Sequence, residues 1–371
     1  MMLKNKRKSD LRVSIIGGGI GGLATAIALH NEGIHAEVYE QASALKEVGA
    51  GIGLRAPSMH LFKHWGIYEE IVEKSVQSDF MEVLTGKGTT IVKEQWPLLT
   101  EKSDEKWARL IHRADLLNTL ISQLPPETIH LNHKCESIIE HENNVEIHFV
   151  NGDSISTDLV IAADGIHSVA RSIFSNDAPV YSGYHAYRTI VDQEDTLGLI
   201  PNDNTTRIYM DDRIQIYFLP LQTRNQVSVD ITAPSLDSSW VPKIEKEDIT
   251  IQLKNFDSKI QQLIKNIEGS LINARALYDR EPIERWSSNF ITLLGDAAHA
   301  MLHNQGQGAN MAIEDAGTLA EALREADTIP EALQYYESKR KPITARYQKL
   351  SRRFPSQQDE TVFHEVIKSD F

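Results

Sequence analysis

The apolar positions at the start of the chain predict a strand, a helix and a second strand. Residues 11–16 form an apolar run with Val and Ile, which suits a buried central strand. Apolar residues then recur at helical spacing over 23–31, and Gly33 ends that segment. A short second strand is expected at 36–39. Strands that alternate with helices indicate an α/β fold with a parallel sheet.

The middle of the chain has a different pattern. Between about 178 and 232, aromatic and β-branched residues alternate with polar ones, which predicts a half-buried antiparallel sheet. Residues 79–94 alternate enough to form paired strands, and helical segments are expected over 246–267. An apolar strand at 290–294 then returns the chain to the first sheet. Two long helices follow, at about 309–324 and 330–350.

Shorter segments complete the first part of the chain. We expect a Gly-rich loop at 48–54 and a helix at 59–65. Residues 107–111 lead into His112-Arg113-Ala114-Asp115, which opens a short helix. A strand from Asp158 ends in Asp164-Gly165, and a helix carrying Ser168 and Arg171 is expected after it.

A glycine-rich turn joins the first strand to the first helix. It contains G-x-G-x-x-G at Gly17, Gly19 and Gly22. In this setting the glycines allow a tight turn, approach of the backbone to a pyrophosphate, and close packing of helix on strand. The helix N-terminus offers N–H groups to the phosphates. Glu40 follows the second strand, where its carboxylate can accept a hydrogen bond from a ribose 2′-OH. The order and spacing of strand, glycine turn, helix, second strand and acidic residue predict an adenine dinucleotide site, for NAD or FAD.

A second informative stretch, GDAAHAMLHNQGQGANMAIEDA, spans residues 295–316. Asp296 stands at the end of the predicted strand, and a helix is expected to begin at Gly306-Gln307-Gly308. A carboxylate facing free N–H groups at a helix start can hold one polar ligand from two sides. An ordinary strand–turn–helix is the alternative for this stretch taken alone.

Composition limits the classes of function. The 371 residues are 41% hydrophobic and 24% charged, which is ordinary for a globular protein. A net charge of −14 argues against nonspecific nucleic-acid binding. The single cysteine, Cys135, excludes an intramolecular disulfide and a multi-cysteine metal site, and no metal is predicted. No run approaches the roughly 18 apolar residues of a membrane span, and the basic residues before position 10 lack a signal-peptide pattern. We expect a cytoplasmic monomer or homodimer.

Three separated motifs together resemble one family. They are GGGIGG at 17–22, DLVIAADGIHSVAR at 158–171 and the stretch at 295–316. The combination is similar to the class A FAD-dependent aromatic hydroxylases, most of all to the salicylate, 3-hydroxybenzoate and 6-hydroxynicotinate hydroxylase branch. The resemblance covers about residues 11–350. It implies a Rossmann-like FAD-binding domain of the GR2 type, interleaved with a smaller antiparallel-sheet substrate domain and followed by C-terminal helices.

The resemblance also implies domain limits and cofactor contacts. The FAD-binding domain would comprise 11–78, 100–175 and 286–350, the substrate domain 79–99 and 176–285, and the tails 1–10 and 351–371. By matching motifs, the implied FAD-binding residues are Gly17, Gly19, Gly22, Glu40, Arg55, Arg113, Asp164, Gly165, Asp296, Gly306, Gln307 and Gly308. Within this set Asp296 would bind the ribityl chain, and the helix after Gly306 would face the isoalloxazine.

The reaction that the resemblance implies is ring hydroxylation. NADH or NADPH reduces FAD, O2 adds at C4a, and the C4a-hydroperoxide hydroxylates a small aromatic or heteroaromatic ring, phenolic or acidic in character. A deprotonated ring hydroxyl speeds the attack, so a base is expected near the ring. His303 stands where relatives usually carry Pro or Gln, and a pKa near the working pH would make it the base or a hydroxyl anchor. Further candidates for the substrate site share one face of a strand: Arg213, Gln215 and Tyr217. Tyr217 and Gln215 are also candidates for a catalytic role.

Other interpretations stay open. The same fold would suit a purine, a polyketide or antibiotic, or alkene epoxidation, and a non-catalytic flavin-binding protein is a third possibility. A plain NAD-dependent dehydrogenase would leave residues 296–308 without a role. His303 and Arg213 can equally be exposed residues without a catalytic role, and Asp164 can simply stabilise a turn. His299 and Asp315 fit structural roles, and Arg171 fits either a scaffold ion pair or contact with the reductant.

Overall fold

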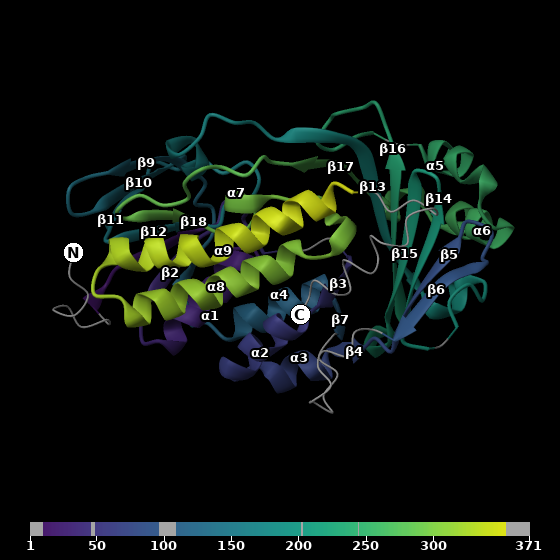
Figure 1. Ribbon diagram of the computed structural model, residues 1–371, viewed down its shortest axis with the longest axis horizontal. Helices are drawn as coiled ribbons and strands as arrows, with labels where there is room; N and C mark the ends of the chain where they lie inside the picture. The colour runs from purple at the N-terminus through teal and green to yellow at the C-terminus, as the bar shows by residue number, and fades with distance from the viewer. Residues whose placement is uncertain (1–9, 46–48, 96–108, 202, 244, 354–371) are drawn as a thin grey trace.

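The structure is a computed structural model that describes residues 10–45, 49–95, 109–201, 203–243 and 245–353. The predicted tails, 1–10 and 351–371, lie almost wholly outside these ranges. Val48 of the predicted loop and Trp107 of the segment that leads into His112 lie outside them as well. Figure 1 shows two parts side by side along the long axis, one built on a parallel sheet and one on an antiparallel sheet.

The first part is built on a five-stranded parallel sheet in the order β18-β12-β1-β2-β8. Its strands are β1 (Val13–Ile16), β2 (Ala36–Tyr39), β8 (Ile129–His130), β12 (Leu159–Ala162) and β18 (Ile291–Leu293). All four residues of β1 are buried, as are those of β12, which explains why both strands are apolar throughout. The predicted strand–helix–strand unit is confirmed, because α1 (Ile20–Asn31) joins β1 to β2, which pair in parallel.

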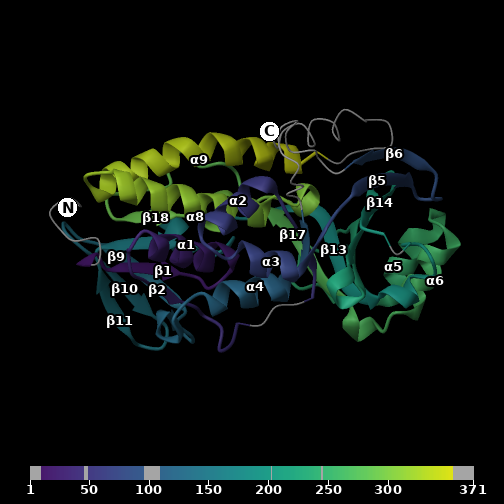
Figure 2. The ribbon, with the colours of Figure 1, turned by 90° about the horizontal axis from the view of Figure 1, so that it is seen from below.

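Different layers cover the two faces of this sheet. Three long helices lie on one side, and α1 packs against α8. A three-stranded antiparallel sheet lies on the other side in Figure 2. The second and third long helices are α8 (Gly308–Glu325) and α9 (Ile329–Ser351), and the small sheet consists of β9 (Cys135–Glu140), β10 (Val145–Phe149) and β11 (Ser154–Thr157). A capping box between Thr328 and Glu331 fixes the start of α9.

The second part is a seven-stranded sheet in the order β17-β13-β16-β15-β14-β5-β6. One face carries the apolar side chains of Ile216, Phe218 and Val229, which pack against two helices. The opposite face carries polar side chains toward the first part. The strands are β5 (Phe80–Thr85), β6 (Thr90–Gln95), β13 (Val180–Asp192), β14 (Thr205–Asp211), β15 (Ile214–Leu221), β16 (Gln226–Pro234) and β17 (Asn273–Asp279), and the helices are α5 (Lys246–Gln252) and α6 (Ser258–Asn266).

Several local predictions need correction. Gly51–Leu54 is a strand, β3, because it pairs with β7 (Arg109–His112) instead of forming a loop. Only a 3-10 turn at Ala170–Ile173 follows Asp164, so Ser168 is not helical. β17 and β11 are strands that the pattern of the sequence did not indicate. β4 (Ser75–Gln77) completes the β3-β7-β4 sheet, beside α2 (Ala56–His64), α3 (Tyr68–Glu73) and α4 (Arg113–Ser122).

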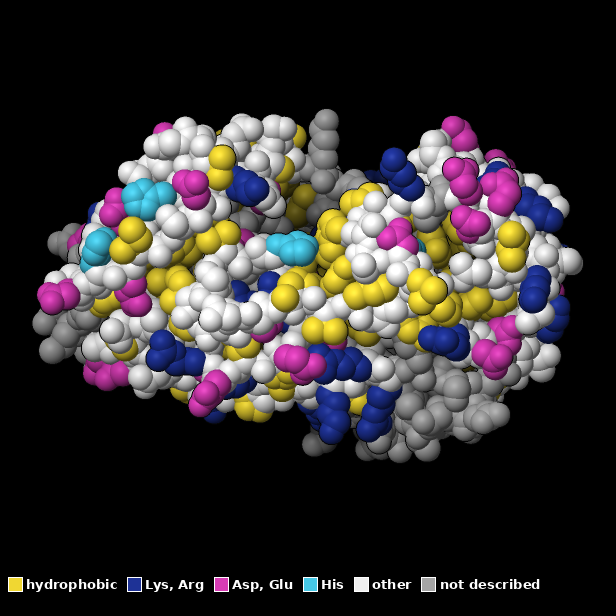
Figure 3. Space-filling model, turned by 90° about the horizontal axis from the view of Figure 1, so that it is seen from above, with side chains coloured by type: hydrophobic (Ala, Val, Ile, Leu, Met, Phe, Trp, Pro, Cys, Tyr) yellow, Lys and Arg dark blue, Asp and Glu magenta, His cyan; other side chains and the backbone are white. Residues whose placement is uncertain are grey.

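The visible surface carries charges of both signs. In Figure 3, basic and acidic side chains are interspersed, and hydrophobic side chains gather along the middle of the molecule. Within the described ranges, no helix combines the length and apolar character that a membrane crossing requires. The same residues contain no group of three or more His, Cys, Asp or Glu placed to bind a metal ion.

Candidate active site

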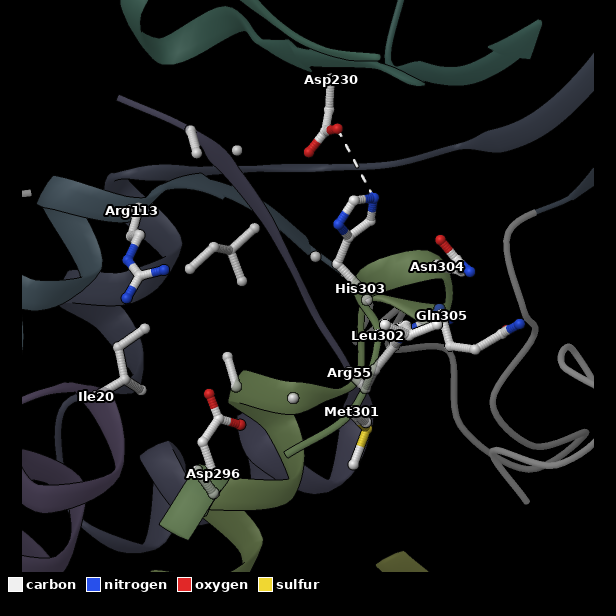
Figure 4. A pocket seen from close by; sticks show the side chains of 18 of the residues that line it. Ile20, Arg55, Arg113, Asp230, Asp296, Met301, Leu302, His303, Asn304 and Gln305 are labelled. Carbon is white, nitrogen blue, oxygen red and sulfur yellow. Dashed lines mark ion pairs between the residues drawn. The ribbon is translucent and has the colours of Figure 1, made fainter. Parts of the chain in front are cut away.

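A cavity of about 540 Å³ lies between the two parts. It is continuous from the glycine turn after β1 to the polar face of the seven-stranded sheet (Figure 4). The predicted site residues that line it are Gly19, Arg55, Arg113, Gly165, Tyr217, Asp296, His303, Gly306 and Gly308. The structure therefore brings residues from three distant motifs to one space.

The glycine turn is built for close backbone contacts. Gly17 has φ +104°, and a Cβ there would lie 2.3 Å from the carbonyl oxygen of Ala163. A Cβ at Gly22 would lie 1.9 Å from the carbonyl oxygen of Gly17. At Gly19, by contrast, a Cβ would meet no protein atom within 4 Å, because this position opens into the cavity. Two glycines are thus required by the fold, and the third leaves space for a ligand such as a pyrophosphate.

Glu40, at the end of β2, is held by backbone groups. Its Oε2 accepts a hydrogen bond from the Gly18 N–H at 2.7 Å, and its Oε1 accepts one from Ala42 N–H at 2.8 Å. These bonds fix the carboxylate beside the turn. Each oxygen has a second lone pair that can accept a ribose hydroxyl.

The opposite wall is formed by the short helix α7 (Asp296–His299), which follows β18, and by the start of α8. Figure 4 shows Asp296 and Arg113 projecting toward the same space from separate elements. Burial raises the pKa of Asp296, while His299 and Arg113 oppose the rise. α8 begins at Gly308, without a side-chain cap and without an acidic residue in its first turn. Its N-terminal N–H groups and dipole therefore favour an anionic or electron-rich ligand.

Asp164 stabilises a turn and also has an oxygen without a protein partner. Its Oδ2 accepts a hydrogen bond from Val169 N–H at 2.8 Å, as the turn interpretation expects. Its Oδ1 is buried and has no hydrogen-bond partner among the described residues. Burial raises the pKa of this carboxyl group, against the effect of its hydrogen bonds. The adjacent Gly165 has φ +78° and lines the cavity.

Residues expected to be structural form buried networks. His299 Nε2 lies 2.6 Å from Asp315 Oδ2, and Arg340 Nε donates to Asp315 Oδ1 at 2.7 Å. The network ties the short helix that begins at Asp296 to α8 and α9. Arg171 is 1% exposed; it pairs with Asp177 and donates to the carbonyl oxygens of residues 297 and 298, which supports the scaffold interpretation.

The sheet end of the cavity carries a row of polar side chains on three neighbouring strands. Arg188 of β13 is directly opposite Asp230 of β16, which is directly opposite Tyr217 of β15. Paired residues of antiparallel strands project from the same face, so the three side chains lie together. Arg188 Nε donates to Asp230 Oδ2 at 2.6 Å. Burial would raise the pKa of Asp230, but Arg188 and His303 hold it below its ordinary value.

His303 reaches this row from the segment before α8. Its Nδ1 lies 3.0 Å from Arg188 Nη2 and its Nε2 lies 2.7 Å from Thr232 Oγ1. Because arginine only donates, Nδ1 accepts and the ring is neutral with its proton on Nε2. Burial lowers the pKa of His303 to about 4, although Asp230 opposes the change. The prediction of a pKa near the working pH is therefore wrong, because the cavity wall desolvates the ring.

The three candidates on the β15 face have different surroundings. Tyr217 lines the cavity, and its hydroxyl lies within 2.9 Å of Gln215 Oε1 and 3.1 Å of Asn304 O. Burial, with the charge of Asp230, raises the pKa of Tyr217, so it keeps its proton and is a donor. Gln215 is buried behind Tyr217 and does not line the cavity.

Arg213 does not support the prediction of a substrate-facing arginine. It is exposed before β15 begins, contacts Tyr184 and does not line the cavity. Among the FAD-site predictions, Gly17, Gly22, Glu40, Asp164 and Gln307 likewise lie outside the cavity lining. For the glycines this agrees with the packing roles given above. Gln307 is buried at the N-cap of α8.

Sequence reasoning missed Arg188, Asp230 and Thr232. The two charged residues lie in strands that the alternating pattern predicts, but a pattern within one strand does not give its register with the next. The sequence did show one charged residue in each of two predicted strands, an arginine in the first and an aspartate in the second. This signal became specific only when the register placed them opposite each other.

Comparison with known proteins agrees with this geometry. A family model described as "FAD binding domain" matches residues 10–351. The chain is 31% identical over 355 residues to a 3-amino-4-hydroxybenzoate 2-monooxygenase of Streptomyces cremeus, covering 93% of this chain and 86% of that protein. It is 32% identical over 349 residues to a 3-hydroxybenzoate 6-hydroxylase of Polaromonas naphthalenivorans, with coverage of 91% and 86%.

A solved structure shows the same fold. Klebsiella pneumoniae HpxO complexed with FAD and uric acid matches with a TM-score of 0.85 at 23% identity, covering 97% of this chain and 92% of that one. At this identity the likeness concerns the fold alone. Together with the relatives and the motifs, the match over residues 10–351 shows that the chain belongs to the FAD-binding-domain family and is an FAD-dependent monooxygenase of the aromatic-hydroxylase type.

Proposed function

We propose that this monooxygenase uses NADH or NADPH and O2 to hydroxylate a small aromatic or heteroaromatic ring. The observation that carries the proposal is one continuous cavity, which joins the cofactor motifs at one end to the polar row of Arg188, Asp230 and Tyr217 at the other. The division into an FAD-binding domain and a substrate domain, with the limits given above, is part of this proposal.

At the motif end, the residues fit FAD. Gly19 leaves space beside the N-terminus of α1, Glu40 offers acceptor lone pairs, and Asp296 projects into the cavity. Arg113, Arg55, Gly165 and the start of α8 would complete the contacts. When bound, FAD supplies the electron transfer and the activation of oxygen that the protein side chains cannot. The N-terminus of α8 would stabilise negative charge on the reduced flavin ring.

At the sheet end, the side chains suit a flat ring with polar substituents. Met81, Ile208 and Leu219 provide apolar walls that exclude water. Tyr217 and His303 provide hydrogen-bonding groups at the end of this apolar space. The lowered pKa of His303 keeps its ring neutral at pH 7 but makes it a weak base, which favours the role of hydroxyl anchor over that of substrate base. We propose that His303 and Tyr217 orient the ring, with Gln215 positioning Tyr217.

The substrate panel follows from the relatives' names. We propose aminohydroxybenzoates, hydroxybenzoates and 6-hydroxynicotinate as the leading candidates, since relatives named for these compounds match over more than 90% of the chain. Urate enters as an alternative, because a protein of the same fold is described in complex with uric acid. Polyketides and alkenes represent the remaining alternatives.

The test uses the purified FAD-loaded protein with each compound, NADH or NADPH, and air. The proposal predicts that at least one aromatic compound accelerates oxidation of the reductant and yields a hydroxylated product in near-stoichiometric amount. If only a purine, a polyketide or an alkene is converted to product, the protein is a monooxygenase of that substrate class and the aromatic assignment is wrong. Failure to bind FAD, or peroxide as the only product with every compound, would contradict the proposal.

A further inference from the structure

We propose that the substrate ring carries an N–H donor that binds Asp230 Oδ1, so that aminophenols and ring lactams form the substrate class of this site. The inference rests on the proposed function and adds to it the chemical character of the ring. Asp230 projects from β16 into the cavity, at the end opposite Asp296 (Figure 4).

The two oxygens of the Asp230 carboxylate have different surroundings. Oδ2 accepts the short hydrogen bond from Arg188 Nε at 2.6 Å. Oδ1 is buried and has no hydrogen-bond partner among the described residues. His303 Nε2 lies 3.7 Å from Oδ1, which is beyond hydrogen-bond distance. The proton of that nitrogen lies toward Thr232 Oγ1, at 2.7 Å.

A charged acceptor without a donor is costly inside a protein. The row that contains Asp230 supplies no donor to Oδ1, because the Tyr217 hydroxyl lies near Gln215 and Asn304 instead. A donor on a bound ring would satisfy Oδ1 in the low-dielectric space above the apolar walls. Such a bond to a charged group is stronger than one between neutral partners.

The charge of this end of the cavity also favours a donor-bearing ring. Arg188 and Asp230 neutralise each other, and the pKa of His303 keeps that ring uncharged at pH 7. Arg213, the cation that the sequence predicts for the substrate site, is at the surface. A carboxylate directed at this end would therefore meet Asp230 without a net positive charge to offset the repulsion. The carboxylate of an acidic substrate is expected to lie away from Asp230.

The first experiment uses the wild-type FAD-loaded protein and follows ligand binding through the change in flavin absorption. Two matched pairs differ in the N–H donor: 3-amino-4-hydroxybenzoate with 4-hydroxybenzoate, which keeps the phenol group, and 4-quinolone with N-methyl-4-quinolone. We expect the donor-bearing member to bind at least about tenfold more tightly in at least one pair. Differences below threefold in both pairs, or no binding of any of the four compounds, would overturn the inference.

The second experiment exchanges the acceptor for a donor. In Asp230→Asn, the amide oxygen must take the place of Oδ2 to accept from Arg188, so the NH2 group takes the place of Oδ1. The preference for the donor-bearing ring is expected to fall by about tenfold. Asp192→Asn, an exposed position at the end of β13, is the matched control and should keep the wild-type preference. An unchanged preference in Asp230→Asn would contradict the inference.

The two proposals fail in different ways. If Asp230→Asn does not fold, the wild-type ligand pairs still decide the inference. If the donor-bearing rings bind tightly but no hydroxylated product forms, the proposed function fails and the inference about binding stands. If a ring without an N–H donor binds as tightly and is hydroxylated, the function stands and the inference fails.

Discussion

The two ends of the cavity are built in different ways. At the motif end, the chain positions its ligand contacts through neighbours in sequence: Gly17, Gly19 and Gly22 share one turn, and Glu40 follows the next strand. At the sheet end, Arg188, Asp230 and His303 come from segments more than 40 residues apart and meet only through strand pairing and loop packing. The glycine turn and Glu40 are thus specified locally, although Arg113 and Asp296 reach the same end from distant segments, and the substrate end depends on strand register.

This difference explains why one end suits a common cofactor and the other a particular ring. A backbone cradle with no room for side chains accepts the same phosphate groups in any chain that folds this way. A row of side chains on a sheet can change one residue at a time without altering the strands that carry it. Substitutions at the two ends should therefore separate cofactor binding from substrate binding.

The largest effect is expected from Gly22→Ala. The new Cβ would lie 1.9 Å from the carbonyl oxygen of Gly17, so the turn must shift and lose its phosphate contacts. We expect the affinity for FAD to fall more than about 100-fold, measured by fluorescence titration of the FAD-free protein. Gly269→Ala is the control, because its new Cβ would meet no other atom within 4 Å, and this variant should bind FAD as the wild type does.

Gly19→Ala separates ligand contact from folding. The fold has room for this Cβ, so the FAD-free protein should keep its melting temperature. The methyl group would nevertheless stand in the space assigned to the pyrophosphate, and we expect about tenfold weaker FAD binding. Equal FAD affinity in Gly19→Ala and wild type would show that the cofactor does not approach this turn.

His303→Ala tests the sheet end. With the ring gone, Thr232 and Arg188 lose their shared partner and the substrate loses its anchor. We expect hydroxylated product per oxidised NAD(P)H to fall about tenfold, with FAD affinity within twofold of wild type. Coupled hydroxylation at the wild-type level, with an unchanged pH profile, would remove His303 from the mechanism.

The depressed pKa of His303 predicts how stability depends on pH. In the unfolded chain this histidine takes up a proton near pH 6.5, whereas in the folded protein its pKa is about 4. Stability is therefore lost as the pH falls from above 6.5 toward 4. We measure the free energy of unfolding of the FAD-free protein in urea at pH 7.5 and at pH 4.5. Between these pH values, His303→Gln should lose about 2 kcal/mol less of this free energy than the wild type loses.

The control for this measurement is His30→Gln, at an exposed position in the last turn of α1. It should leave the pH dependence of stability as in wild type. If His303→Gln also leaves it unchanged, the ring is not desolvated as the structure indicates.

The smallest effect is expected from Arg213→Ala. The arginine is exposed and contacts Tyr184 at the surface, away from the cavity lining. Steady-state assays should give kcat and KM values within twofold of wild type. A larger change in KM for an acidic ring would restore Arg213 to the substrate site and weaken the contrast between the two ends.

The accuracy of the sequence-based predictions follows the same division. β1, α1, β2 and the long helices α8 and α9 were predictable, because each has a local periodic pattern and a local start or stop signal. The turn after Asp164 was predicted as a helix, and β3 as a loop, because their final conformation depends on partners elsewhere in the chain. For β3 that partner is β7.

In the site, side-chain environment was the missing information. Arg213 and Tyr217 share a strand face by spacing alone, but Arg213 lies before the strand begins and only Tyr217 reaches the cavity. Similarly, the sequence identifies His303 as a titratable residue, but its pKa depends on burial beside Arg188 and Asp230. The periodicity of a sequence predicts which side chains share a face of one element, but it does not predict how far the folded protein shields a side chain from water.

The most direct test of the account is a crystal structure of the FAD-loaded protein with 3-amino-4-hydroxybenzoate bound. The account predicts the FAD pyrophosphate at the Gly19 turn, the flavin ring beside Asp296 and the start of α8, and the substrate ring between the flavin and the row of Arg188, Asp230 and Tyr217. An aromatic ring bound outside this cavity, or a flavin that fills its sheet end, would contradict the account.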